Sequence, residues 1–180
     1  MFGRVISVCV SLGLLLQSTL SFASLEHVRD DKGNFKIHVP SQWQSNRNLF
    51  GMPFSMLGPY QKGKRRPIVI IIPMGNAGQD MPKVSLKDNN HYRAGREKWL
   101  RKVGGKSLAF YPYSEEKIGA HTRGFSVGYR YFAGNTVFEE HTYYVTCKKK
   151  LYNFKTITTS TDRDSTKKTI LESLRSFDCE

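Results

Sequence analysis

The sequence has few acidic residues and very few cysteines. Its 180 residues contain 28 Lys and Arg against 15 Asp and Glu, which gives a net charge of +13. The three cysteines form no CxxC pair, the arrangement usual in redox dithiols, and they are too few for a four-cysteine zinc site. A thioredoxin-like oxidoreductase and a cysteine-rich zinc module are therefore excluded.

Long apolar runs are also scarce. Outside the N-terminus, no stretch reaches the roughly 18 to 20 apolar residues of a membrane span. Residues 1–23 combine a lone Arg4, an apolar run and small residues up to Ala23, the pattern of a secretory signal peptide cleaved after Ala23. An uncleaved N-terminal anchor is the alternative, and Cys9 lies in no lipoprotein context. We expect an exported protein, either periplasmic or secreted.

Removal of residues 1–23 leaves 157 residues with a charge of +12, since Arg4 is lost. This length suits one domain over residues 24–180. Cys147 and Cys179 are then the remaining cysteines, and an even pair in an exported protein predicts a disulfide bond. The bond would stabilise the fold by roughly 3 to 4 kcal/mol. Two free thiols are the alternative.

The segment from Gly124 to Ile157 contains three aromatic and β-branched runs with short polar breaks at 133–135 and 148–150. This pattern predicts an antiparallel meander. Alternate residues from Phe125 to Tyr131 are apolar, which gives the first run one apolar face. Phe132, Phe138 and Tyr144 fall on the alternate positions, so we expect the sheet to be covered on both faces.

Further strands are predicted over 28–31, 35–39, 68–72, 108–113 and 116–122. A helix is predicted from Asp88 to Val103, capped by Asp88 or Asn89. Its predicted buried stripe is Tyr92, Trp99, Leu100 and Val103. A second helix is predicted within 161–177, starting at Asp162 or Asp164, and its predicted buried residues are Ile170, Leu171, Leu174 and Phe177. The fold class is α+β, a central antiparallel sheet with helices.

Motifs for catalysis and cofactors are missing. The sequence has no HExxH, no GKS or GKT phosphate loop, and no two histidines four residues apart. We predict no catalytic residue, no cofactor and no metal site. Glu139 and His141 share a strand face, and we interpret them as a polar pair. A hydrolase with an unrecognised site at His141 or His121 is the alternative.

One stretch is typical of a contact surface. Apolar side chains alternate with Gly and Pro from residue 49 to residue 60, and a basic loop follows. Methionines and aromatics can form an adaptable apolar surface. We predict that this loop pair binds an acidic or amphipathic protein partner; ordinary core and loop is the alternative. The candidate residues are Phe50, Met52, Phe54, Met56, Tyr60, Lys62, Lys64, Arg65 and Arg66.

The excess of positive charge also allows a different partner. Basic residues cluster at 62–66, 93–106, 148–150 and 167–168. Such a field attracts anionic polymers and lipid headgroups. Binding of an anionic polymer or a membrane surface is thus an alternative function. Nucleic acid is not expected, because the chain has an export signal and no nucleic-acid motif.

Two short motifs carry a family resemblance. Phe-x-Ile-x-Val-Pro-x-x-Trp spans Phe35 to Trp43, and Ser-Leu-Arg-Ser-Phe ends the second helix at Phe177. With a mid-chain helix and a meander containing Tyr143-Tyr144 between them, the chain resembles the superfamily that includes photosystem II PsbP, the Mog Ran-binding proteins and bacterial DcrB. The resemblance implies an α/β/α sandwich, with helices on both faces of the sheet. It also implies an accessory protein without catalytic machinery. We expect an exported accessory protein that binds an envelope or secretion component.

Overall fold

The computed structural model describes residues 26–30, 34–76, 85–118 and 123–179. The predicted signal peptide over residues 1–23, with Cys9, lies outside this part of the chain. His121 lies outside it as well.

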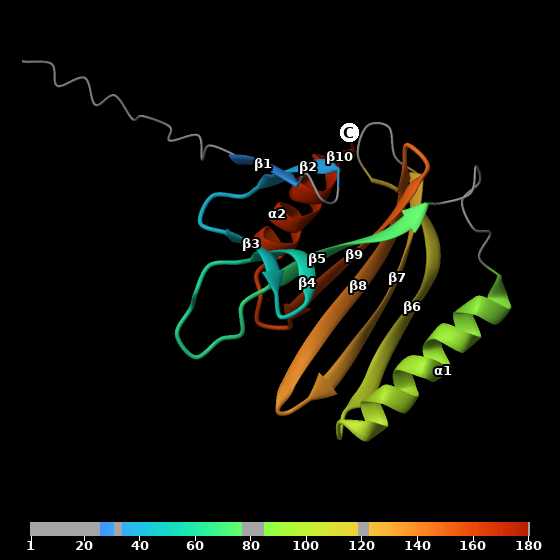
Figure 1. Ribbon diagram of the computed structural model, residues 1–180. Helices are drawn as coiled ribbons and strands as arrows, with labels where there is room; N and C mark the ends of the chain where they lie inside the picture. The colour runs from blue at the N-terminus through green and yellow to red at the C-terminus, as the bar shows by residue number, and fades with distance from the viewer. Residues whose placement is uncertain (1–25, 31–33, 77–84, 119–122, 180) are drawn as a thin grey trace, which may run out of the picture.

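A seven-stranded antiparallel sheet forms the centre of the molecule (Figure 1). In spatial order its strands are β3 (Gln44–Leu49), β4 (Met52–Leu57), β5 (Ile68–Asn76), β9 (Lys150–Thr159), β8 (Thr136–Cys147), β7 (Arg123–Ala133) and β6 (Lys106–Lys117). The predicted meander is strands β7 to β9. Gly134 and Asn135 join β7 to β8 with φ of 52° and 66°. Two residues with positive φ suit a tight hairpin, whose twist matches that of the strands.

One face of this sheet packs against a second, smaller sheet and a helix. The small sheet has the order β1 (Glu26–Asp30), β2 (Phe35–Val39) and β10 (Asp178–Cys179), and the helix is α2 (Asp164–Arg175). We call this side of the large sheet the α2 face. Its core includes Phe35, Ile37, Phe54, Phe154 and Leu174, each at most 2% exposed. Both sheets therefore share one core.

The predicted pairing of Cys147 with Cys179 is present at this core. The disulfide joins the end of β8 to β10, with 6.1 Å between the two Cα atoms. Because β10 pairs with β2, the bond links the large sheet to the small sheet.

The helix α1 (Leu86–Lys102) lies beside β6 at one edge of the large sheet, on the opposite side, which we call the α1 face (Figure 1). Ser85 caps this helix: its hydroxyl accepts from the amide of Asp88 at 3.2 Å, and the Asp88 carboxylate accepts from the Ser85 amide at 2.8 Å. The core here is small and comprises Leu100, Tyr129, Tyr131 and Phe138.

The α+β class is confirmed, but an α/β/α sandwich with helices on both faces is not the arrangement found. The α2 face is covered by a sheet and a helix together, and α1 lies only along the β6 side of the α1 face. The physical reason is that α1 buries a single residue fully, Leu100, so it cannot cover the whole sheet. Strands β4 and β5 extend beyond it.

Several predicted elements are corrected. The cap of α1 is Ser85, and Asp88 is its third residue. Helix α2 begins at Asp164, one of the two predicted start residues, but it has no side-chain cap. Leu171, predicted to be buried, is 40% exposed, because the apolar stripe of α2 is narrower than expected. The two strands predicted over 108–122 are one strand, β6, as far as the described residues extend.

Three further strands, β3, β4 and β10, were not predicted. β4 lies in the segment that was interpreted as a contact loop. β3 has the sequence QSNRNL, which is polar on both faces because it is an edge strand with little burial. β10 is only two residues long and depends on its pairing with β2. Neither α1 nor α2, the helices of the described residues, is long and apolar enough to cross a membrane.

Candidate functional site

The predicted contact surface is divided by strand β4. Phe54 and Met56 are completely buried, because alternate side chains of β4 point into the core on the α2 face. These two residues cannot contact a partner, and their inclusion in a binding surface was wrong. The alternation that buries them was present in the sequence MPFSML.

The exposed members of the predicted surface lie at opposite ends of β4. Phe50, in the turn before the strand, is 92% exposed, and Tyr60, after it, is 74% exposed. A six-residue strand spans roughly 20 Å, so these rings do not form one patch. Met52 is half-buried within β4, while Lys62 and Lys64 are exposed in the following loop.

The two arginines of this loop have different environments. The guanidinium of Arg66 donates from Nε to the Gly58 carbonyl at 2.5 Å, from Nη1 to Gln44 Oε1 at 2.9 Å, and from Nη2 to the Leu57 carbonyl at 3.2 Å. Arg66 therefore holds the loop against β3 and β4. The exposed Arg65 instead places its guanidinium 5.3 Å from the centre of the Phe138 ring, a favourable cation–π contact.

Arg65 and Arg66 border a groove of about 620 Å³ on the α1 face. The groove lies where the last turn of α1 approaches strands β8 and β9 and the start of β5. Its apolar lining is Ile68, Trp99, Val103, Tyr131, Ala133, Phe138 and Ile157. We call it the apolar groove.

The exposure of α1 explains why the groove is open. Leu100 is 1% exposed and packs on Tyr131 and Phe138, whereas Trp99 and Val103 are 41% and 49% exposed. The indole of Trp99 meets Tyr131 edge to face, with ring centres 6.0 Å apart. The predicted buried stripe of α1 is thus only partly buried, and its exposed part forms one wall of the groove. Sequence periodicity signals an apolar stripe but not what covers it.

The groove has a positively charged border. Arg65 and Arg66 supply this border, and the exposed Arg101 and Lys102, which do not line the groove, add positive charge in the last turn of α1. Cations at this position are favourable because the carbonyl end of a helix is partly negative. An apolar floor with basic edges attracts a ligand that is apolar in its middle and acidic at its ends.

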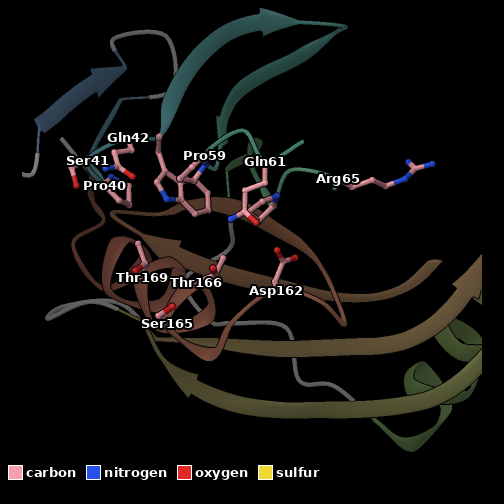
Figure 2. A pocket seen from close by; sticks show the side chains of 12 residues that line it. Pro40, Ser41, Gln42, Pro59, Gln61, Arg65, Asp162, Ser165, Thr166 and Thr169 are labelled. Atoms are coloured by element: carbon pink, nitrogen blue, oxygen red, sulfur yellow. The ribbon is translucent and has the colours of Figure 1, made fainter. Parts of the chain in front are cut away.

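A smaller polar pocket of about 260 Å³ adjoins the apolar groove, with Arg65 shared between them. It lies between the turn after β2, the loop after β4 and the first turns of α2. Figure 2 shows Ser165, Thr166 and Thr169 of α2 on one side and Gln42 and Pro59 on the other. Arg65 points away from this pocket in Figure 2, consistent with its position over Phe138.

A charged cluster beneath α1 was missed by sequence reasoning. Glu140, only 3% exposed, accepts from Tyr129 at 2.9 Å, contacts Arg96 of α1, and lies 3.4 Å from Lys155. Arg96 also donates to the Tyr129 hydroxyl and lies over its ring. Burial, and then the neighbouring Glu140, raise the pKa of Tyr129. Strand register places Tyr129 opposite Glu140, and the packing of α1 on the sheet adds Arg96.

This cluster attaches helix α1 to the large sheet. One buried carboxylate has two cations and a phenol as partners, so its charge is compensated without solvent. Arg96 comes from the middle of α1 and the other three residues come from β7, β8 and β9. The cluster therefore holds α1 on the sheet by polar contacts.

The pair of Glu139 and His141 lies on the α2 face. His141 Nε2 is 3.1 Å from Glu139 Oε1, and Lys167 donates to Glu139 Oε2 at 2.9 Å. Burial opposes ionisation, but the hydrogen bonds from Lys167 and His141 outweigh it and lower the pKa of Glu139. The His141 ring stacks on Tyr111, with ring centres 5.2 Å apart. The described contacts of its ring are thus with a carboxylate and with aromatic rings, and within the described ranges no group of three or more His, Cys, Asp or Glu could hold a metal.

Comparison with known proteins identifies structures with a similar fold but no protein with a similar sequence. No protein-family model matches the sequence, and a search of curated proteins finds no match. Among solved structures, the chain is similar to cyanobacterial PsbP (CyanoP) from Synechocystis sp. PCC 6803, at 17% identity and a TM-score of 0.56, over 97% of this chain and 99% of that one. The chain has a PsbP-like fold.

Two other structures have the same fold at low identity. LpqN, involved in cell envelope biogenesis of Mycobacterium tuberculosis, is 12% identical with a TM-score of 0.53, over 86% of this chain and 90% of LpqN. A protein from Bacteroides thetaiotaomicron is 13% identical with a TM-score of 0.51, over 86% of this chain and 48% of its own. At these identities the likeness concerns the fold alone.

Proposed function

We propose that this chain is an exported, non-enzymatic accessory protein that binds a protein partner in the apolar groove of the α1 face. The partner supplies a segment with apolar side chains that fill the groove and acidic side chains that meet its basic border. The observation that carries this proposal is the groove itself: an open apolar wall at Trp99 and Val103 with Arg65 beside it.

The charge of the chain supports an acidic partner. With 28 basic against 15 acidic residues, the protein steers negative surfaces toward itself. Specificity comes from the apolar floor, because a polyanion or a headgroup would gain nothing from Trp99 and Val103. A folded partner with an exposed acidic and apolar segment satisfies both features. The partner is an envelope or secretion component in this proposal.

Export is supported by independent features of the chain. Residues 1–23 have the composition of a secretory signal, and disulfides such as Cys147–Cys179 persist mainly in oxidising compartments. LpqN, a structural neighbour, is described as involved in cell envelope biogenesis. A non-enzymatic role is supported by the contacts of His141, which are with Glu139 and aromatic rings.

Site-specific photo-crosslinking tests this proposal. A photoreactive amino acid at position 103 in the groove should crosslink a defined protein in the native host, while the same residue at position 149, in the β8–β9 turn, should not. Arg65→Glu should weaken the position-103 crosslink by roughly tenfold, because it repels acidic groups at the border. Arg66 is left intact because it holds the loop.

Lys149→Glu is the matched control, since it changes the total charge by the same amount away from the groove. If Lys149→Glu weakens the crosslink as much as Arg65→Glu does, general charge attraction is sufficient and a groove-specific partner is disproved. Co-sedimentation with anionic phospholipid vesicles separates the lipid alternative: binding there that does not depend on Val103 would favour a membrane surface.

A further inference from the structure

His27 and His38 face each other across the first two strands of the small sheet. They are direct partners in the antiparallel register of β1 and β2. Their Nε2 atoms are in contact, and the ring centres are 3.4 Å apart at an angle of 75°. Directly opposed residues are the closest side-chain pairs between strands. Two imidazole nitrogens are thus directed at the same point.

This pair lies on the outer side of the small sheet. Ile37 and Val39, the neighbours of His38 in β2, are buried in the core, so the alternation of the strand turns His38 outward. His38 is half-buried and His27 is exposed. Ions in solution can therefore reach both rings.

Cationic side chains neighbour the pair on the outer side of the small sheet. On the same side, Arg29 and Lys36 form the next cross-strand pair, and Lys36 makes an ion pair with Asp178 of β10 at 3.1 Å. Burial, together with His27, lowers the pKa of His38. Neutral imidazole is the form that binds metals, because its nitrogen lone pair is available.

We propose that His27 and His38 form a two-histidine site for a transition-metal dication such as Zn²⁺, Cu²⁺ or Ni²⁺. Imidazole suits these ions, and Zn–N bonds are about 2.0 to 2.1 Å long. Rotation of the two outer rings lets both Nε2 atoms reach one ion. Because no third His, Cys, Asp or Glu joins the pair among the described residues, water or an external ligand completes the coordination.

Such an ion would fasten the first described strand to the rest of the fold. In the small sheet, β1 pairs with β2 alone, whereas β2 also pairs with β10. A bridge from His27 to His38 adds a cross-strand link to this edge strand. Binding to the folded state alone also raises stability with metal concentration, by mass action. The site is separate from the apolar groove and does not depend on the proposed function.

Metal titration of the untagged protein tests the site. After dialysis against EDTA, Cu²⁺ is titrated by calorimetry and followed by electron paramagnetic resonance. We expect one ion per chain with nitrogen hyperfine structure from two imidazoles. His27→Ala and His38→Ala should each weaken binding by roughly tenfold or more, because one imidazole alone gives no chelate. His91→Ala, which removes an exposed histidine of α1, is the matched control and should not alter binding.

Hydrogen exchange provides a second readout. Zn²⁺ should slow exchange of the β1 amides in the wild-type protein and leave them unchanged in His38→Ala. His38→Ala is decisive, because any site built from His27 and a flanking group would survive it. Equal Cu²⁺ affinity in His38→Ala and wild type overturns the proposal. The absence of any binding by the wild type at metal concentrations well above that of the protein overturns it as well.

Discussion

The two faces of the large sheet are held by different kinds of interaction. On the α2 face, aromatic rings pack edge to face: Phe35 meets Phe54 with ring centres 5.4 Å apart, and Phe154 meets Phe177 at 4.7 Å. A disulfide closes the same core. On the α1 face, Leu100 is the one described residue of the helix that is fully buried. Ring contacts of Tyr92 and Trp99 with the sheet and the polar contacts to Glu140 add to it.

This difference separates the face that stabilises the fold from the face where we propose that a partner binds. The α2 face places its apolar side chains in contact with each other, so little apolar area is left for a partner. The α1 face is fastened by a charged cluster, which leaves Trp99 and Val103 exposed to solvent. Because polar contacts hold helix α1 on the sheet, the apolar groove beside it can stay open. Substitutions matched across the two faces test this comparison.

The largest effect is expected at the centre of the α2 face. Phe154→Ala should lower the free energy of unfolding by about 4 kcal/mol, because it removes a fully buried ring and leaves a cavity. Urea unfolding measures the change. Phe132→Ala, at a ring that is 39% exposed, should cost less than about 1 kcal/mol. Phe132 alternates with Tyr131 of the α1 face along β7, so it lies at the margin of the α2 face. Equal losses at the two positions would show that Phe154 is not in the main core.

A smaller effect is expected from the cluster beneath α1. Glu140→Gln should lower the free energy of unfolding by about 2 to 3 kcal/mol, because it removes the charge shared by Arg96 and Lys155. Hydrogen exchange should increase first in α1, since the cluster joins this helix to the sheet. Uniform exchange across both faces would contradict a local fastening.

The neighbouring Glu139 is the matched control for Glu140, since it lies on the opposite face. Glu139→Gln should cost less than about 1 kcal/mol, because its partners Lys167 and His141 are partly exposed. Its carboxyl has a lowered pKa in the folded protein, so its contribution is present above the unfolded pKa, about 4.3. As pH falls through the folded pKa, the difference between Glu139→Gln and wild type should disappear.

The sequence predicted helices and strands correctly wherever their apolar periodicity matched the faces that are buried in the fold. The meander of β7 to β9, strand β2 and helix α2 have strong apolar periodicity, and they lie close to where the pattern placed them. Helix α1 has a weaker apolar stripe, and its capping and C-terminal glycines located it. β3 has no such periodicity because, as an edge strand, it buries little, and β10 is too short to have one. The PsbP-like resemblance gave the correct fold, although not the covering of the two faces.

The site was predictable only in part. Arg65 was selected from its basic loop, but its position over Phe138 depends on a contact 73 residues away in the chain. Trp99 and Val103 were selected as buried, because periodicity reports an apolar stripe and not its covering. Glu140 was passed over for Glu139, since which of two adjacent carboxylates faces a helix depends on strand register.

The smallest effect on stability is expected in the groove. Val103→Ser should change the free energy of unfolding by less than about 0.5 kcal/mol, because half of the side chain is exposed. The same substitution at the fully buried Val145, on the α2 face, should cost about 2 to 3 kcal/mol. Thermal unfolding of both variants, measured in the same buffer, gives the comparison directly. A large loss at Val103 would mean that the groove wall supports the fold, and the separation between a stabilising face and a proposed binding face would then fail.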